Sequence, residues 1–121
     1  MKAITLLYIA NATLLLLHEI ESAYEKEWET LKLPGKITGF LLLHIPIIMI
    51  LFYGLIEIEK SSNVGLIFGV ILGIGGIIPS IVHKIIFKTA DQFNLPISNA
   101  IIYFNILSGV GLLFLSVRSF A

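Results

Sequence analysis

Three histidines, His18, His44 and His83, are the residues of this sequence best suited to metal or acid–base chemistry. Each lies in or at the end of a different hydrophobic run, where an ionisable side chain is costly and needs a partner. If the runs cross a bilayer in succession, all three imidazoles fall towards the same membrane face. We therefore expect them to share one layer of the protein.

Carboxylates follow His18 on one side of the first predicted helix. At about 100° per residue, Glu21, Ser22 and Glu25 all lie within about 60° of His18 around the helix axis. Asn11 extends this polar stripe further into the run. Two other carboxylates are expected to point away from it: Glu19 and Glu27.

Imidazole nitrogens and carboxylate oxygens are the usual ligands of zinc, non-haem iron and manganese. The sequence therefore predicts a divalent metal (zinc, iron or manganese) bound by His18, His44, His83 and Glu21. Glu21 and Glu25 are the candidate catalytic carboxylates, because a carboxylate can act as general base for a metal-bound water. Three further polar residues are expected to orient the ligands: Asn94, Ser98 and Ser22. For any one histidine taken alone, a hydrogen bond to a neighbouring helix is the simpler interpretation.

The elements that must position these residues are membrane-spanning helices. Of the 121 residues, 57% are hydrophobic, well above the average soluble domain. About 20 apolar residues in a helix cross the hydrocarbon core of a bilayer, and the apolar runs predict four spans, at 3–23, 37–57, 64–87 and 97–117. We expect an all-α, four-helix transmembrane bundle in which residues 1–121 form a single domain. A soluble bundle is excluded because segments such as 47–52 leave no polar stripe.

Lysine and arginine predict the orientation of the spans. The first and third connections carry Lys26, Lys32, Lys36, Lys84 and Lys88, against Lys2, Lys60 and Arg118 on the opposite side. This bias places the histidine layer at the cytoplasmic face and both termini on the outer side.

Glycines recur at three- and four-residue spacing in the third run, at Gly65, Gly69, Gly73 and Gly76. Such small-residue patterns let membrane helices approach closely. The partner is either another span of the chain or a second copy of it, which makes a homo-oligomer through Gly65, Gly69 and Gly73 one of the expected arrangements.

Composition removes several classes of function. The chain has no cysteine, so disulfides, thiolate catalysis and cysteine-bound clusters are excluded. No basic patch or motif for nucleic acid is present, and the formal net charge is zero. The lipid bilayer is the partner that the composition predicts.

Short motifs resemble a family of small bacterial four-span membrane proteins of unknown function. In that family the first span ends in His-Glu-Leu-Asp and is followed by Glu-Trp, as His18-Glu19-Ile20-Glu21 and Glu27-Trp28 do here. The resemblance extends to three further places: His44-Ile45-Pro46, His83 and Phe93-Asn94. It implies the fold, the topology and a bacterial inner membrane, and it implies no activity. Glu21 stands where aspartate is more usual, and the single histidine of the third span leaves a further ligand there in doubt.

The leading hypothesis is a metal-dependent membrane enzyme, of hydrolase or oxidase type, acting on a lipid or other apolar substrate at a cytoplasm-facing His/Glu pocket. Transport of protons or metal ions is the first alternative. It ranks lower because the polar residues of the other leaflet are few and uncharged: Asn11, Asn105, Ser108 and Ser116. The second alternative is a non-catalytic assembly subunit that associates through its glycine face.

Overall fold

The structure, a computed structural model, describes residues 2–30, 32–81 and 96–120. These ranges form five helices: α1 (Ala3–Tyr24), α2 (Glu27–Thr30), α3 (Lys36–Glu59), α4 (Asn63–Ile81) and α5 (Pro96–Ser119). Within them there is no strand. The predicted all-α fold is confirmed. The short α2 lies in the charged connection between the first two predicted spans, where the sequence did not predict a helix.

The outer surface of the bundle is apolar. α1, α3 and α5 are long and apolar enough to cross a membrane, and α4 contributes a shorter apolar helix. On α3, for example, Leu42 and Met49 expose 62% and 67% of their surface. Continuous apolar surface of this extent is stable in lipid and not in water. The chain therefore has the fold of a helical membrane bundle.

Helix boundaries agree closely with hydropathy in three of the four spans. The predicted spans 3–23, 37–57 and 97–117 each differ from α1, α3 and α5 by two residues or fewer at either end. The third predicted span, 64–87, corresponds to α4 as far as Ile81, and its last residues lie outside the described ranges.

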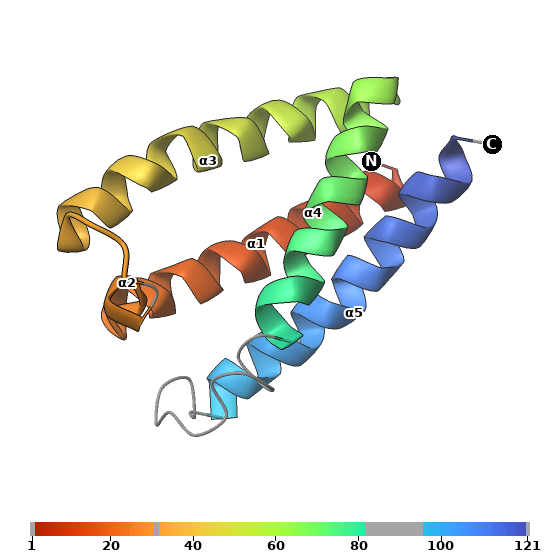
Figure 1. The fold of residues 1–121 in the computed structure, drawn as a ribbon. Coiled ribbons are helices and arrows are strands. Elements are labelled where there is room, and N and C mark those ends of the chain that lie inside the picture. The colour runs from red at the N-terminus through yellow and green to blue at the C-terminus, as the bar shows by residue number, and fades with distance from the viewer. Residues whose placement is uncertain (1, 31, 82–95, 121) are drawn as a thin grey trace.

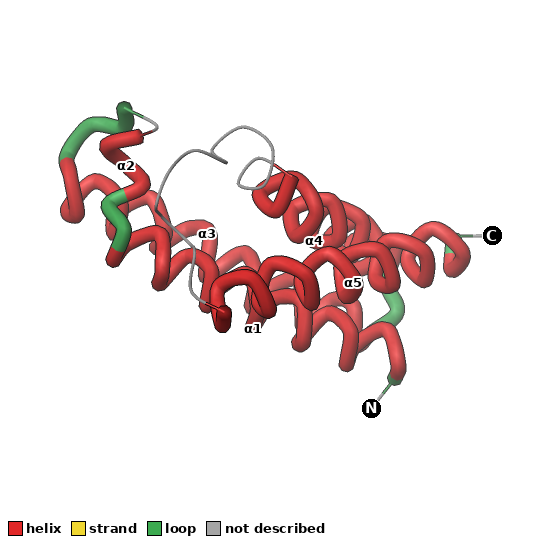
Figure 2. Tube along the Cα trace, turned by 90° about the horizontal axis from the view of Figure 1, so that it is seen from below, coloured by secondary structure: helices red, strands yellow, loops and turns green. Residues whose placement is uncertain are grey.

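Helix α5 packs along both α4 and α1, and α3 packs against α4 and, less closely, against α1 (Figures 1 and 2). Both termini lie at one end of the bundle, which we call the terminal end, while α2 marks the opposite one, which we call the α2 end. At the terminal end the Lys2 ammonium donates to the backbone oxygen of Glu59 over 2.6 Å and also contacts Ser61. The core between the two ends is formed by Tyr8, Ile58, Leu72 and Leu112.

The regularly spaced glycines of α4 face other helices of the same chain. A Cβ on Gly65 would overlap the backbone of α3 at Glu57, and one on Gly69 would overlap the Ser116 side chain of α5. A Cβ on Gly73 would lie 2.8 Å from the backbone oxygen of Gly109. The close packing expected of this face is thus made within the chain, and a second copy could bind here only if those contacts opened.

A buried polar centre joins α1, α4 and α5 halfway along the bundle. The Asn11 amide donates to the backbone oxygen of Leu72 over 3.0 Å, and the Ser108 hydroxyl donates to Asn11 Oδ1 over 2.8 Å. Asn11 and Asn105 are 0% and 2% exposed. Hydrogen bonds between membrane helices contribute about 1 kcal/mol each, so this centre fixes the register of the three helices.

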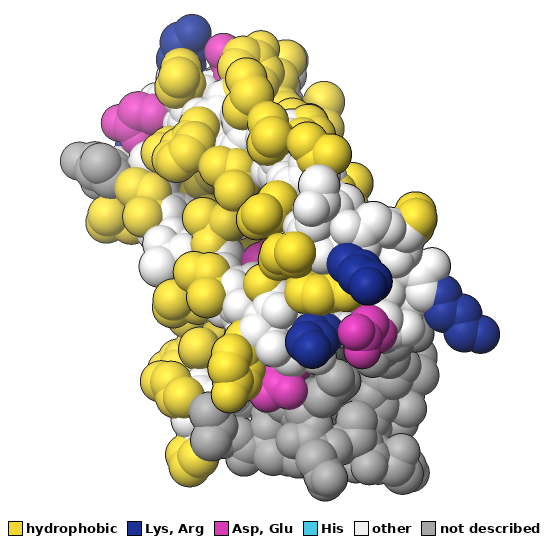
Figure 3. Space-filling model, turned by 90° about the vertical axis from the view of Figure 1, so that its left-hand side faces the viewer, with side chains coloured by type: hydrophobic (Ala, Val, Ile, Leu, Met, Phe, Trp, Pro, Cys, Tyr) yellow, Lys and Arg dark blue, Asp and Glu magenta, His cyan; other side chains and the backbone are white. Residues whose placement is uncertain are grey.

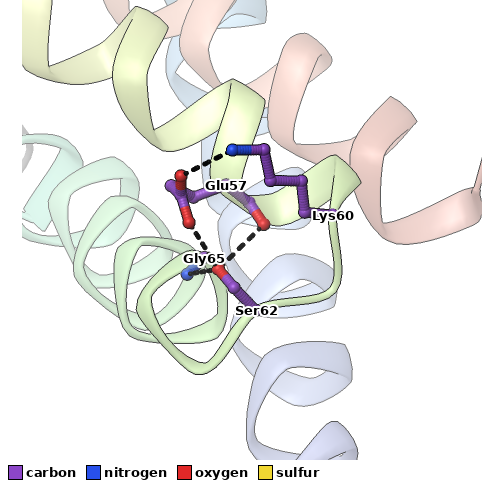
Figure 4. A network of polar contacts seen from close by, with 4 residues as sticks. All are labelled: Glu57, Lys60, Ser62 and Gly65. Carbon is purple, nitrogen blue, oxygen red and sulfur yellow. Dashed lines mark hydrogen bonds and ion pairs between the residues drawn. The ribbon is translucent and has the colours of Figure 1, made fainter.

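The turn between α3 and α4 is fixed by Ser62, which caps α4 (Figure 4). Its hydroxyl accepts from the backbone N–H of Gly65 over 3.0 Å and donates to a carboxylate oxygen of Glu57 over 2.8 Å. Lys60 lies 3.3 Å from the other carboxylate oxygen. Ser62 is therefore the N-cap residue of α4, a position at which serine is strongly preferred.

From the end of α1 to the first residue of α3, four of the described residues have left-handed backbone. Gly35 has φ of 89°, a conformation that glycine adopts without steric cost, directly before the first residue of α3. Lys26, Lys32 and Lys36 also have positive φ. These turns bring the start of α3 back beside the end of α1, where the candidate site residues lie.

Candidate functional site

His44 is the best-defined residue of the site. It occupies the third turn of α3 and only 9% of its surface is exposed. Its Nδ1 lies 2.7 Å from the backbone oxygen of Phe40, and its Nε2 lies 2.5 Å from Oε2 of Glu19 on α1. The imidazole also stacks on the Phe40 ring, with centroids 4.1 Å apart. Both ring nitrogens and one ring face are therefore held.

These contacts determine where the imidazole hydrogens lie. A backbone oxygen can only accept, so Nδ1 must carry a hydrogen and donate to Phe40. The second contact joins Nε2 to a carboxylate oxygen, and a hydrogen must lie between these two atoms for the contact to be attractive. His44 is thus oriented so that Nε2 is the nitrogen offered to a partner.

Glu19 was expected to point away from the polar stripe of His18 and was therefore left out of the predicted site, but the structure brings it into contact with His44 of α3. Residues 18 and 19 differ by about 100° around α1, so they face different neighbours. The structure places α3 on the side that Glu19 faces. The signal that could have revealed this is the period of the apolar residues, because Ala12 and Leu16 lie on the same face of α1 as Glu19.

Glu21 belongs to a second contact, with α5. The Ser98 hydroxyl donates to Oε2 of Glu21, and Ser98 itself is 1% exposed. Ser22 is fully buried on α1, and its hydroxyl has no hydrogen-bond partner among the described residues. Sequence reasoning placed Glu21, Ser22 and Ser98 in one region, and the structure brings Glu21 and Ser98 into contact.

The remaining site residues are only partly placed. His18 is buried on α1, 4% exposed, and both His18 and Glu25 make interactions within the protein. His83 and Asn94 lie outside the described residues. Among the residues that the structure does describe, no three histidines and carboxylates lie close enough together to hold one metal ion. The three-histidine layer with Glu21 stays a prediction.

An aromatic cluster supports His44 from the α2 end. Trp28 of α2 packs on Phe40 with ring centroids 5.6 Å apart, and Phe40 in turn stacks on His44. Figure 3 views the molecule from the side that carries α2: lysine and glutamate side chains gather there, hydrophobic side chains cover much of the rest, and no histidine among the described residues is visible on it. The low exposure of His18 and His44 shows that both are interior groups.

The comparison with known families matches residues 4–119 to a family of unknown function (DUF6713). The chain belongs to this family. The match covers nearly the whole sequence, in agreement with the resemblance to an uncharacterised family. Neither a curated protein nor a solved structure matches the chain.

Proposed function

We propose that His44 and Glu19 bind a divalent metal ion at the α2 end of the bundle, and that this metal serves a hydrolytic or oxidative reaction on a lipid. The observation that carries the proposal is the orientation of His44. A histidine that binds a metal through one ring nitrogen usually donates its other N–H to a backbone oxygen or a carboxylate. The bond from Nδ1 to Phe40 supplies that arrangement, and Nε2 faces a carboxylate 2.5 Å away.

The geometry requires one small adjustment. In a tetrahedral zinc site with ligand bonds of about 2.0–2.2 Å, a nitrogen and an oxygen ligand lie about 3.4 Å apart. The present contact between Nε2 and Oε2 is shorter, at 2.5 Å. Rotation of the Glu19 side chain, which is 28% exposed, is enough to open this gap. The metal would take the place of the hydrogen shared by the two side chains.

Other residues contribute according to where they lie. His18 and Glu21 occupy neighbouring turns of α1, and the Ser98 hydroxyl holds Glu21 Oε2 in a fixed direction. With His83, they are the remaining candidates for ligands, and Glu25 for a general base. A bound divalent metal would supply a nucleophilic water or hydroxide near neutral pH. A site within apolar helices suits a substrate that is itself dissolved in the membrane.

Metal binding can be measured directly by equilibrium dialysis of the purified protein in detergent against zinc, manganese or ferrous iron. We expect about one metal per chain, and we expect His44→Ala and Glu19→Ala each to lower the affinity by about 100-fold or more, since even residues that only orient ligands contribute 10- to 100-fold. Glu59→Gln is the matched control, because Glu59 is an exposed carboxylate at the terminal end. It should bind metal as the unaltered protein does.

Size-exclusion chromatography and circular dichroism of the same preparations separate a lost site from a lost fold. Equal metal binding by the unaltered protein and by folded His44→Ala and Glu19→Ala would overturn the proposal. Loss of binding in Glu59→Gln as well would show that the bound metal is surface-associated.

Proton transport is a second candidate, and the structure supplies an observation in its favour. In the structure, several polar residues of the other leaflet are buried within the bundle. Thr5, Asn105 and Ser116 are no more than 2% exposed, and one oxygen of each has no hydrogen-bond partner among the described residues. Buried oxygens of this kind are commonly satisfied by internal water.

Proton flux into proteoliposomes loaded with a pH-sensitive dye tests this candidate. Asn105→Leu should reduce the flux, whereas Ser119→Ala, which alters an exposed hydroxyl bonded within its own helix, should leave it unchanged. Flux equal to that of protein-free vesicles would exclude transport of protons.

A further inference from the structure

A pocket of about 100 Å³ lies between α1 and α3, on the side of the bundle where α3 runs apart from the other helices. Its walls are formed mostly by apolar side chains of the two helices, among them Ala12 and Leu16 of α1 and Ile48, Leu51 and Leu55 of α3. Neither His44 nor Glu19 is among the lining residues, so the pocket is separate from the contact between these two side chains.

The register of the helices aligns this pocket with the proposed site. Ala12 precedes Glu19 by seven residues, and Leu51 follows His44 by seven. Seven residues are almost two helical turns, so each pair lies on one face of its helix, about 10 Å apart along the axis. Leu16 and Ile48 lie between, one turn from Glu19 and His44 respectively. The pocket therefore continues the face on which the two polar side chains meet.

The chemistry of the walls selects the occupant. The only hydroxyls among the lining residues belong to Tyr8 and Thr13. Tyr8 donates to the backbone oxygen of Leu51 over 2.8 Å, and Thr13 donates to that of Ile9 over 2.7 Å. Both hydroxyl hydrogens are thus used within the protein. A polar ligand would lose its bonds to water and gain few in return, whereas an alkyl chain loses nothing.

We propose that this pocket holds the acyl chain of a lipid substrate whose polar end lies at His44 and Glu19. The inference rests on the proposed function, because it assigns a substrate class to that site. The inference adds where each part of the substrate lies. The α2 end of the bundle binds the polar group, and residues from Leu16 towards Tyr8 contact the acyl chain. The pocket of about 100 Å³ takes up only a short part of such a chain, and the rest of the chain would lie along the apolar face that runs for roughly 16 Å of helix from His44 to Leu55.

Photolabelling with a long-chain fatty acid that carries a diazirine in mid-chain tests the assignment. The protein is labelled in detergent after removal of metal with a chelator, so that the outcome does not depend on metal binding, and labelled peptides are identified by mass spectrometry. We expect the label on α1 around residues 8–16 and on α3 around residues 48–55, and we expect an excess of unlabelled long-chain fatty acid to remove it.

Two variants that fill the pocket keep the test independent of any one substitution. Ala12→Phe and Thr13→Trp should each lower labelling of these segments by roughly tenfold, because the added ring occupies the space of the chain. Ala10→Phe is the matched control, since Ala10 lines a different groove, between α1 and α5. It should leave labelling of the pocket unchanged.

Labelling spread evenly over the lipid-facing surface, or labelling of these segments unchanged in folded Ala12→Phe and Thr13→Trp, would overturn the acyl-chain pocket. The outcomes also separate the two proposals. If His44→Ala abolishes metal binding while the pocket fails to label, the metal site stands and the acyl-chain assignment falls. If the pocket labels but no metal binds, the lipid site stands without the proposed chemistry.

Discussion

The direction in which a single side chain points decides the partner of each ionisable group in α1. His18 and Glu19 are neighbours in sequence, yet His18 is buried on one face of α1 while Glu19 meets His44 of α3. The sequence was sufficient to predict that Glu21 and Ser98 lie in one region, because both lie at the same depth on hydrophobic runs. It was insufficient for Glu19, because the side on which α3 packs is set by the turns around Gly35 and by the packing of Phe40.

The contact between His44 and Glu19 should stabilise the fold as well as form the site. Glu19→Ala leaves the buried Nε2 of His44 without a partner, so we expect the free energy of unfolding to fall by about 1–3 kcal/mol. Glu19→Gln keeps a group that can hydrogen-bond to Nε2 and should cost clearly less. Thermal unfolding in detergent measures both variants, and equal stability of the two would argue against a specific contact.

At the level of helices, the composition of α4 determines how closely it packs. A Cβ on Gly76 would lie 2.7 Å from Asn11 Oδ1 and 2.9 Å from Asn105 Oδ1, whereas one on Gly75 would meet nothing within 4 Å. Gly76→Ala should therefore destabilise the bundle by about 1–3 kcal/mol. Gly75→Ala should be neutral or stabilising by up to about 1 kcal/mol, since alanine favours helix over glycine. A comparison of the two by thermal unfolding separates packing from helix propensity, because a similar gain in stability in both variants would mean that helix propensity and not packing decides the effect.

The cap of α4 offers an independent test at the terminal end. Ser62→Ala removes the acceptor for the Gly65 N–H and the donor to Glu57, and we expect a loss of about 1 kcal/mol. The same substitution at Ser119, whose hydroxyl is exposed and bonds within its own helix, should have little effect on unfolding. If both serines tolerate the change equally, the network of Figure 4 does not fix this turn.

Helix positions could be predicted from hydropathy because a bilayer requires long apolar segments, whichever helices they pack against. Which helices pack together could not be predicted in this way. The spacing of Gly65, Gly69 and Gly73 predicts close packing, but only the arrangement of the chain shows that Gly65 meets α3 while Gly69 and Gly73 meet α5. The pocket between α1 and α3 likewise arises from how α3 lies and not from the composition of either helix.

For the molecule as a whole, the placement of lysines predicts which end faces the cytoplasm. Lys26, Lys32 and Lys36 lie around the α2 end, and Lys2 and Lys60 lie at the terminal end. The absence of native cysteine makes labelling of single introduced cysteines straightforward. In intact cells, Lys60→Cys should react with a membrane-impermeant maleimide, and Lys32→Cys should react only after the membrane is opened. The reverse pattern would place the candidate site at the outer face.

The proposed metal site requires that His44 and Glu19 bind one metal ion together. X-ray absorption spectroscopy of the zinc-loaded protein identifies the ligands, because imidazole gives a recognisable pattern of scattering. We predict a nitrogen and oxygen shell at about 2.0–2.1 Å that includes imidazole, and loss of an imidazole contribution in His44→Ala. A spectrum of fully hydrated zinc, or one that is identical in the unaltered protein and in His44→Ala, would contradict the proposed site.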